Sequence, residues 1–171
     1  MNVFYIEIDD FKNKHNKDFL IPYANIELKR EKRFFEYTIG RYLIKYVGEN
    51  YYNIKDSTII VDEKGKPFFK NSNLFFSLSH SKNIVIACFD NFNCGIDVEY
   101  KKDRNLKELS KYFNEEFKTL DNFYEFWTLK EASFKVNNQF KEKRFLKLNN
   151  DYYLTIVSNN ENLDNIELFK I

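Results

Sequence analysis

The sequence C-G-I-D-V-E at residues 94–99 ends in alternating apolar and charged side chains, and this alternation predicts a β-strand. Successive side chains of a strand point to opposite faces, so Ile96 and Val98 would share one face and Asp97 and Glu99 the other. The two carboxylates would then lie within reach of one cation. A solvated strand face shows the same alternation, so this stretch alone does not establish a metal site.

A second stretch, F-W-T-L-K-E-A-S-F-K at residues 126–135, has the spacing of a helix, with Phe123 and Trp127 on the same side. On that helix Glu131 and Lys135 would lie only about 40° apart. Three carboxylates and the two lysines of this stretch could therefore converge. Carboxylate oxygens are ligands that Mg²⁺ prefers, and ammonium groups suit the phosphates of a di- or triphosphate.

The two stretches together resemble the signature pair of the 4′-phosphopantetheinyl transferases. That pair reads G-[IV]-D-[IV]-E and then [FW]-[ST]-x-K-E-[AS]-x-x-K, and residues 95–99 and 127–135 match both patterns without a gap. The signal is specific because the two motifs agree in residue type, internal spacing and order. Recognisable similarity extends over residues 30–136.

The resemblance implies transfer of the 4′-phosphopantetheine group from coenzyme A to a serine of an apo acyl or peptidyl carrier protein, with release of 3′,5′-ADP. It implies that Asp97, Glu99 and Glu131 hold Mg²⁺, which neutralises charge on the pyrophosphate. Lys130 and Lys135 would add positive charge. Lys135 is the better candidate to stabilise or protonate the leaving group.

The attacking serine needs a base, and residues 112–117 resemble the family's F-F-x-x-x-E segment, whose glutamate serves as base or extra metal ligand. Glu116, directly before Phe117, fits this segment best. The spacing is one residue short, so Glu115 stays open. A free glutamate has a pKa of about 4.3 and is a weak base at neutral pH unless its site raises that pKa.

Residues 28–47 show the clearest helical pattern, with an apolar face and a basic stripe, and Gly48 is expected to end the helix. The surfactin-synthetase-activating type of the family carries an arginine-rich helix that contacts the phosphates of coenzyme A. The resemblance therefore implicates Arg33 and Arg41. A solvated helix face would also be basic, so both readings stay open.

Two shorter elements complete the candidate coenzyme A site. Gly65-Lys66-Pro67 predicts a turn, and the alternation of residues 75–80 predicts a strand that ends at Ser79-His80. The resemblance implies that Lys66 contacts the nucleotide end of coenzyme A. It also implies that Ser79 and His80 bind the 3′-phosphate.

The remaining chain gives coarser expectations. Polar residues 11–18 predict a loop, Asn105 predicts the cap of a helix, and Asp121 or Asn122 is expected to cap the next one. Further strands are expected at residues 3–8, 58–61 and 83–89 and in the tail 144–171.

Strands and helices are segregated rather than strictly alternating, which favours an α+β fold. The resemblance implies two similar small lobes with pseudo-twofold symmetry and the active site between them. We expect an N-terminal lobe at residues 1–92 for the coenzyme A nucleotide. The C-terminal lobe, residues 93–171, would carry Mg²⁺ and the catalytic residues.

The composition argues against several classes of protein. Lys and Arg number 27 against 26 Asp and Glu, which is less basic than non-specific nucleic-acid binding usually needs. No apolar run approaches the ~20 residues that span a bilayer, and the first residues lack the pattern of a signal peptide. Cys88 and Cys94 are too few for a metal cluster or redox pair. We expect a cytoplasmic monomer that uses neither nucleic acid nor membrane.

Two functions of other classes remain as alternatives. A metal-dependent nuclease or phosphoesterase also uses an acidic pair with a glutamate and a lysine, but the lysine usually follows the glutamate by two residues on a strand. Here Lys130 precedes Glu131, and Lys135 follows it by four. The other alternative is a non-catalytic homologue that binds carrier proteins, against which the intact Asp97 and Glu99 argue.

Overall fold

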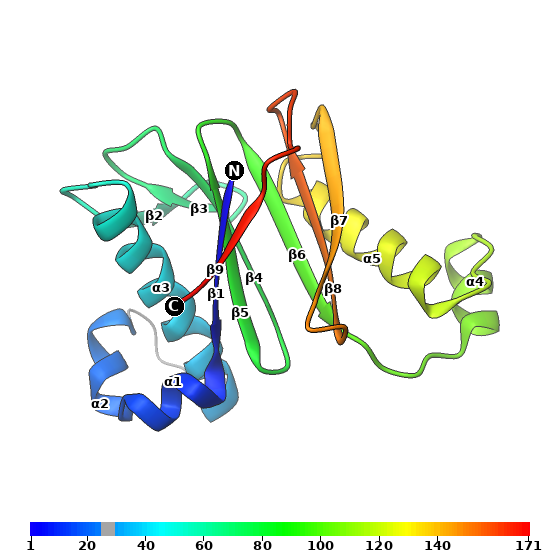
Figure 1. Ribbon diagram of the computed structural model, residues 1–171, viewed down its shortest axis with the longest axis horizontal. Coiled ribbons are helices and arrows are strands. Elements are labelled where there is room, and N and C mark those ends of the chain that lie inside the picture. Colours follow the sequence, from blue (N-terminus) through cyan, green and yellow to red (C-terminus); the bar gives the residue numbers. More distant parts are fainter. Residues whose placement is uncertain (25–29) are drawn as a thin grey trace.

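Two β-sheets meet along their edges in the computed structural model, which describes residues 1–24 and 30–171 (Figure 1). One sheet has the strand order β4-β5-β1-β9, the other has the order β6-β8-β7, and β2 and β3 form a separate hairpin. The strands are β1 (Asn2–Glu7), β2 (Ile59–Val61), β3 (Pro67–Phe69), β4 (Phe75–Ser81), β5 (Ile84–Asp90), β6 (Cys94–Tyr100), β7 (Glu142–Leu148), β8 (Tyr152–Ser158) and β9 (Glu167–Lys170). The helices are α1 (Ile8–Lys14), α2 (Lys17–Leu20), the short 3₁₀ helix η1 (Ile21–Tyr23), α3 (Glu31–Tyr51), α4 (Leu106–Phe113) and α5 (Leu120–Phe134).

The first sheet packs one face against α3. Phe4 of β1 and Val85 of β5 join Ile39 and Leu43 of the helix in one buried cluster. Strand β5 is buried along its whole length because its other face is covered as well. This explains why residues 84–89 of β5 form an unbroken apolar run rather than an alternating one.

The opposite face of the first sheet packs against the second sheet. Ile84 and Ile86 of β5 share a buried cluster with Ile96 of β6 and with Leu154 and Ile156 of β8. Strand β6 therefore turns its apolar residues into this second core, as the alternation of residues 94–99 predicts. Its carboxylates consequently face the other way.

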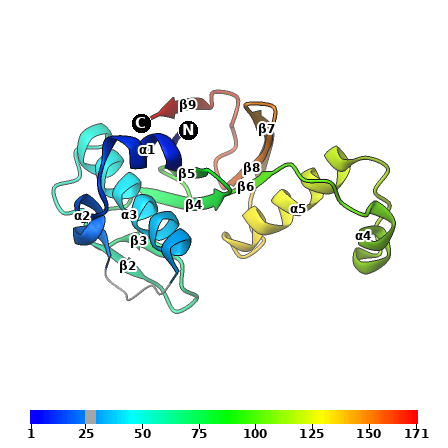
Figure 2. The same cartoon turned by 90° about the horizontal axis from the view of Figure 1, so that it is seen from below.

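Helix α5 covers the outer face of the second sheet, and Ala132 and Val157 form part of the buried contact. The approach is close at Gly95, where a Cβ atom would lie 2.2 Å from the carbonyl oxygen of Ala132. Only glycine leaves room for the helix at this position. Helix α4 lies at the end of the molecule farthest from α3 (Figures 1 and 2).

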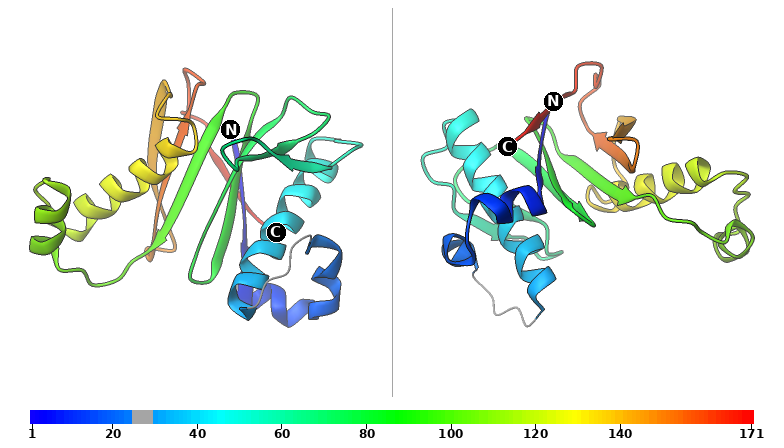
Figure 3. Two further views of the ribbon diagram at one scale, coloured as in Figure 1. Left: turned by 180° about the vertical axis from the view of Figure 1, so that it is seen from behind. Right: turned by 60° about the horizontal axis from the view of Figure 1, so that its bottom comes forward.

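Strands β4 and β6 run side by side although they belong to different sheets (Figures 1 and 3). Serine hydroxyls of β4 bridge them, since each accepts a backbone N–H of β6. The three pairs are Ser77 Oγ with Ile96 N at 3.2 Å, Ser79 Oγ with Val98 N at 3.3 Å and Ser81 Oγ with Tyr100 N at 3.0 Å. We call this contact the serine seam.

The helix predicted at residues 28–47 is present but longer at its C-terminal end. It begins at Glu31 and ends at Tyr51, and residues 28 and 29 lie outside the described residues. The prediction that Gly48 ends the helix is wrong. Gly48 is buried inside the helix, and a Cβ atom there would lie 2.8 Å from the ring of Phe69.

Two other local predictions are also wrong. Residues 11–18, expected as a loop, fall largely within α1 and α2, because Asn16 caps α2 by accepting the N–H of Phe19. The cap of α5 is Thr119, whose hydroxyl accepts the N–H of Asn122. The cap predicted at Asn105 is confirmed.

The last strand joins the first sheet. Strand β9 pairs with β1 in parallel, so a segment from the second half of the chain completes the sheet built by β1, β4 and β5. The division at residue 92 remains a prediction. Among the described helices, none has the length and apolar character to cross a membrane.

Candidate active site

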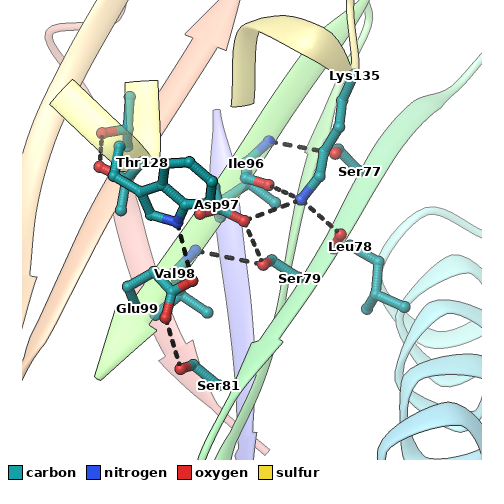
Figure 4. A network of polar contacts seen from close by, with 12 residues as sticks. Ser77, Leu78, Ser79, Ser81, Ile96, Asp97, Val98, Glu99, Thr128 and Lys135 are labelled. Carbon is teal, nitrogen blue, oxygen red and sulfur yellow. Dashed lines mark hydrogen bonds and ion pairs between the residues drawn. The ribbon is translucent and has the colours of Figure 1, made fainter. Parts of the chain in front are cut away.

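Asp97 lies at the centre of the serine seam, in the network of polar contacts shown in Figure 4. Its Oδ1 accepts hydrogen bonds from Ser79 Oγ at 2.8 Å and from Lys135 Nζ at 3.2 Å. Only 7% of the residue is exposed. Its Oδ2 is buried and has no hydrogen-bond partner among residues 1–24 and 30–171.

The environment of Asp97 disfavours an unneutralised carboxylate. Burial raises the pKa of Asp97 to about 6, although Lys135 and the Ser79 hydrogen bond act in the opposite direction. A buried acceptor without a partner is costly, and a nearby cation would satisfy it and favour the charged form. The site is therefore suited to bind positive charge beyond that of Lys135.

Glu99, two residues along β6, has both of its oxygens engaged. Trp127 Nε1 of α5 donates to Oε1 at 3.2 Å, and Ser81 Oγ of β4 donates to Oε2 at 3.2 Å. The carboxylate is thus held from the helix on one side and from the first sheet on the other (Figure 4).

Lys135 follows the last residue of α5 and extends its ammonium group into the seam. Its Nζ donates to Leu78 O of β4 at 3.2 Å and to Ile96 O of β6 at 2.6 Å, in addition to Asp97. These three acceptors match the three N–H donors of an ammonium group. The positive charge is consequently fixed between the two sheets.

Lys66 occupies a comparable position at the neighbouring end of β6. The turn predicted at residues 65–67 is present, with Gly65 at φ +82°. It directs Lys66 Nζ to Asn93 Oδ1 at 2.6 Å and to Cys94 O at 3.1 Å. Burial lowers the pKa of Lys66, so this ammonium group would also gain from a nearby anion.

A cleft of about 590 Å³ lies beside the ammonium-bearing side chains of Lys66 and Lys135. Lys66, His80, Phe134 and Lys135 all line it. Phe134 is 76% exposed and, with Phe76 and Leu78, contributes apolar surface to the wall of the cleft. The cleft therefore combines an apolar surface with two fixed ammonium groups.

His80 also lines a second hollow, together with Arg33 and Glu36 of α3. His80 Nδ1 lies 3.7 Å from Glu36 Oε1. Burial lowers the pKa of His80, and the Glu36 carboxylate opposes this effect. Arg41 stands farther along α3, with its guanidinium 5.8 Å from the ring centre of Tyr37.

Ser79 and His80 have different surroundings although they are neighbours. The Ser79 hydroxyl donates to Asp97, whereas the His80 ring lies beside Glu36. Adjacent residues of a strand point to opposite faces, which explains the separation. Their joint contact with one phosphate remains a prediction.

Other predicted residues lie outside this network. Glu131 is partly buried and has no hydrogen bond or ion pair to Asp97 or Glu99 in the part of the chain described. Lys130 is exposed, with its Nζ 4.9 Å from the ring centre of Phe113. Within residues 1–24 and 30–171, no three His, Cys, Asp or Glu side chains lie close enough to hold a metal ion together.

The side chains of the candidate bases make no hydrogen bond or ion pair with the seam in the described part of the chain. Glu116 lies in the link between α4 and α5, where its carboxylate is 3.8 Å from Lys118 Nζ and largely exposed. Glu115 is exposed in the same link. The choice between them remains a prediction.

Asp97 and Glu99 nevertheless fit a magnesium ion. They present hard oxygens on one strand face, and Oδ2 of Asp97 lacks any other partner among the residues described. Mg²⁺ in proteins is usually held by one or two carboxylates, with phosphate oxygens and water as the other ligands. The two carboxylates therefore supply enough protein ligands, and Asp97 contacts Lys135, which lines the cleft.

The contacts of Ser81 and Trp127 with Glu99 were missed by sequence reasoning. A signal for the serines was present, since residues 76–81 read F-S-L-S-H-S and place a serine at every second position. That spacing puts all three hydroxyls on one side of the strand. What faces them cannot be read from β4 alone.

No protein-family model matches the chain. It is 30% identical to the 4′-phosphopantetheinyl transferase HetI of Nostoc sp. over 70% of this chain and 61% of HetI. It is 27% identical to the 4′-phosphopantetheinyl transferase gsp of Aneurinibacillus migulanus over 72% of this chain and 55% of gsp. It is 28% identical to the 4′-phosphopantetheinyl transferase Sfp of Bacillus subtilis over 79% of this chain and 69% of Sfp. The chain thus spans less than two thirds of HetI and of gsp, and it is similar to several proteins that share the name 4′-phosphopantetheinyl transferase.

Proposed function

We propose that the protein transfers the 4′-phosphopantetheine group of coenzyme A to a serine of an apo acyl or peptidyl carrier protein. The observation that carries this proposal is Asp97, a buried carboxylate with an unpartnered oxygen, beside the fixed ammonium group of Lys135. The pairing suits a substrate that brings phosphates and a divalent cation together. The names of the relatives support the same reaction.

In this proposal the cleft binds the nucleotide end of coenzyme A. Lys66 is held at the cleft wall by Asn93 and Cys94, where it can meet a phosphate as a point charge. His80 and Arg33 line the adjoining hollow and are the candidates for the 3′-phosphate. Arg41 remains a more distant candidate on the same helix.

The metal ligands proposed are Asp97 and Glu99, with Glu131 as a third that must turn toward them. When bound, Mg²⁺ supplies positive charge to the pyrophosphate and lowers the cost of charge on the departing phosphate. The protein's own contribution is to keep Oδ2 of Asp97 free for this ion while Ser79 and Lys135 engage Oδ1.

In the reaction, the serine oxygen of the carrier protein bonds to the β-phosphorus of coenzyme A as the bond to 3′,5′-ADP breaks. Glu116, or Glu115 beside it, takes the serine proton. Lys135 stabilises the leaving phosphate by its charge, since its three donors are already engaged with Leu78, Ile96 and Asp97. Lys130 would add charge only after leaving the ring of Phe113.

We also propose an arrangement of the two lobes, a cellular location and an oligomeric state for the protein. The two lobes would be related by pseudo-twofold symmetry, an idea supported by the long helix beside each sheet and by the edge strands β4 and β6 meeting between them. The protein would act as a cytoplasmic monomer, with coenzyme A and a carrier protein as its partners.

Intact mass spectrometry of apo carrier proteins incubated with coenzyme A, Mg²⁺ and this protein tests the proposal. We expect one phosphopantetheine added per carrier protein, 3′,5′-ADP released in equal amount and no addition with Asp97→Asn. A carrier protein that binds without gaining mass would instead support the non-catalytic alternative. Cleavage of DNA would support the nuclease.

A further inference from the structure

The serine seam does more than join two strands. Each of its three hydroxyls accepts a backbone N–H of β6, but the hydroxyl protons have different destinations. Ser79 donates to Asp97 at 2.8 Å and Ser81 donates to Glu99 at 3.2 Å. Ser77 has the same backbone contact and is buried, but the carboxylates lie with the other two serines.

A hydroxyl group has a single proton to donate. The Ser79 proton is directed to Oδ1 of Asp97, so Ser79 cannot donate to a phosphate while that bond exists. One of its two lone pairs accepts the N–H of Val98. Both partners lie on β6, and Ser79 is therefore a fixed link between the first sheet and the carboxylate of the second.

The hydrogen bonds from Ser79 and Ser81 determine how the oxygens of Asp97 and Glu99 are presented to a cation. Ser79 and Lys135 both bind Oδ1 of Asp97, which keeps Oδ2 without a partner among the described residues. On Glu99, Ser81 and Trp127 bind opposite oxygens and so restrict rotation of the carboxylate group. Each oxygen of Glu99 retains acceptor capacity for a cation, because a carboxylate oxygen has more than one lone pair.

We propose that Ser79 and Ser81 are positioning residues, which orient Asp97 and Glu99 toward the divalent cation across the serine seam. This inference rests on the proposed function for the identity of the cation. It assigns Ser79 to the carboxylate rather than to the 3′-phosphate. In this proposal both sheets contribute to the cation site, because the ligands lie on β6 and the hydroxyl groups that orient them lie on β4.

Binding of Mn²⁺, a paramagnetic substitute for Mg²⁺, tests the inference by electron paramagnetic resonance on the full chain with coenzyme A and no carrier protein. Groups that orient metal ligands typically contribute 10–100-fold to metal affinity. We therefore expect Ser79→Ala and Ser81→Ala each to weaken Mn²⁺ binding by roughly tenfold or more. Ser81→Thr, which keeps a hydroxyl, should recover most of the loss.

Ser77→Ala is the matched control, because it removes an equivalent seam contact from a serine that donates to neither carboxylate. It should lower the urea midpoint of unfolding about as much as Ser79→Ala while leaving Mn²⁺ affinity at the wild-type value. Equal loss of Mn²⁺ affinity in all three alanine variants would overturn the inference in favour of simple packing. Wild-type affinity in Ser79→Ala and Ser81→Ala would overturn it as well.

A second measurement tests whether Ser79 binds the 3′-phosphate. Titration with 3′,5′-ADP in the presence of a chelator should give the same affinity for Ser79→Ala as for the wild type. A lower affinity of Ser79→Ala for 3′,5′-ADP, together with normal Mn²⁺ binding, would instead assign Ser79 to the 3′-phosphate. Because neither measurement needs turnover, an absence of transfer activity would refute the proposed function without deciding the role of the serines.

Discussion

Nζ of Lys135 lies 3.2 Å from Oδ1 of Asp97, and the same ammonium group also binds carbonyl oxygens on both edge strands. One side chain thus serves as a structural link between β4 and β6 and as the charge partner of the buried carboxylate. Its position depends on the end of α5, because Lys135 is the C-cap residue directly after that helix.

Lys135→Met should lower kcat by about 10²-fold or more, since removal of a group that stabilises transition-state charge typically has this effect. Lys135→Arg should not restore the rate, because a planar guanidinium cannot replace an ammonium held between two carbonyls. Lys130→Met is the comparison, and we expect a smaller loss because its Nζ lies over Phe113. Steady-state kinetics with coenzyme A and a carrier protein would measure both, and a larger loss in Lys130→Met would reverse these assignments.

Gly95→Ala should destabilise the protein by about 1–3 kcal/mol, the usual cost of adding atoms to a packed contact. The new methyl group would meet a backbone oxygen of Ala132, which α5 cannot move without shifting as a whole. Gly40→Ala is the control, since its methyl group would meet only the flexible end of Leu78 and would favour the helix. Urea unfolding of both variants would show the difference, and equal midpoints would contradict the close approach of α5.

The His80 imidazole should titrate below the usual His pKa of about 6.5, because burial disfavours its charged form. The groups that face it are Glu36, Lys32, Lys135 and Glu99, and their charges partly cancel. Proton NMR can follow this titration readily because the chain has only two histidines. Since the folded pKa is depressed, the contribution of His80 to stability should be present above about pH 6.5 and lost as the pH falls.

Addition of 3′,5′-ADP extends this measurement to the phosphate contact. A phosphate beside the imidazole would raise the pKa of His80, because a nearby opposite charge favours the protonated form. The signal of His15 should not move and serves as the internal control. An unchanged pKa for His80 at saturating 3′,5′-ADP would remove it from the phosphate site.

Asp97→Ala should abolish transfer while leaving the binding of 3′,5′-ADP within about threefold of the wild type. The nucleotide contacts proposed lie on Lys66, His80 and Arg33 and do not involve this carboxylate. Calorimetric titration in the presence of a chelator measures the binding, and mass spectrometry the transfer. A near-normal transfer rate at low Mg²⁺ would show that Asp97 is not a metal ligand.

Local patterns predicted the parts of the fold that depend on neighbouring residues. The alternation at residues 94–99 placed Asp97 and Glu99 on one face, and Asn105 was recognised as a helix cap. Gly48 was misread because its reason lies in the ring of Phe69, which is distant in sequence. The sequence pattern of a helix does not distinguish a glycine that ends the helix from a glycine inside it that leaves room for a neighbouring side chain.

The residues of the candidate site likewise divide into those that sequence motifs predict and those that only the packing brings together. The motifs supplied Asp97, Glu99 and Lys135, whereas the donors to Glu99 come from Ser81 on β4 and Trp127 on α5. These partners are 18 and 28 residues from Glu99 in the sequence. The packing of the two sheets decides which side chains meet across such distances. The alternation of residues within one strand does not predict these partners.

The pairing of β9 with β1 has a consequence for the order in which the protein folds. Asn2 pairs with Glu167, so this contact closes nearly the entire chain into one loop. Contacts of such large sequence separation carry a high entropic cost and form late. During synthesis, β1 can pair with β5 long before β9 leaves the ribosome, and its other edge stays open for that interval. An open strand edge can recruit another chain, so nascent molecules should be most prone to aggregate in the interval before β9 is made.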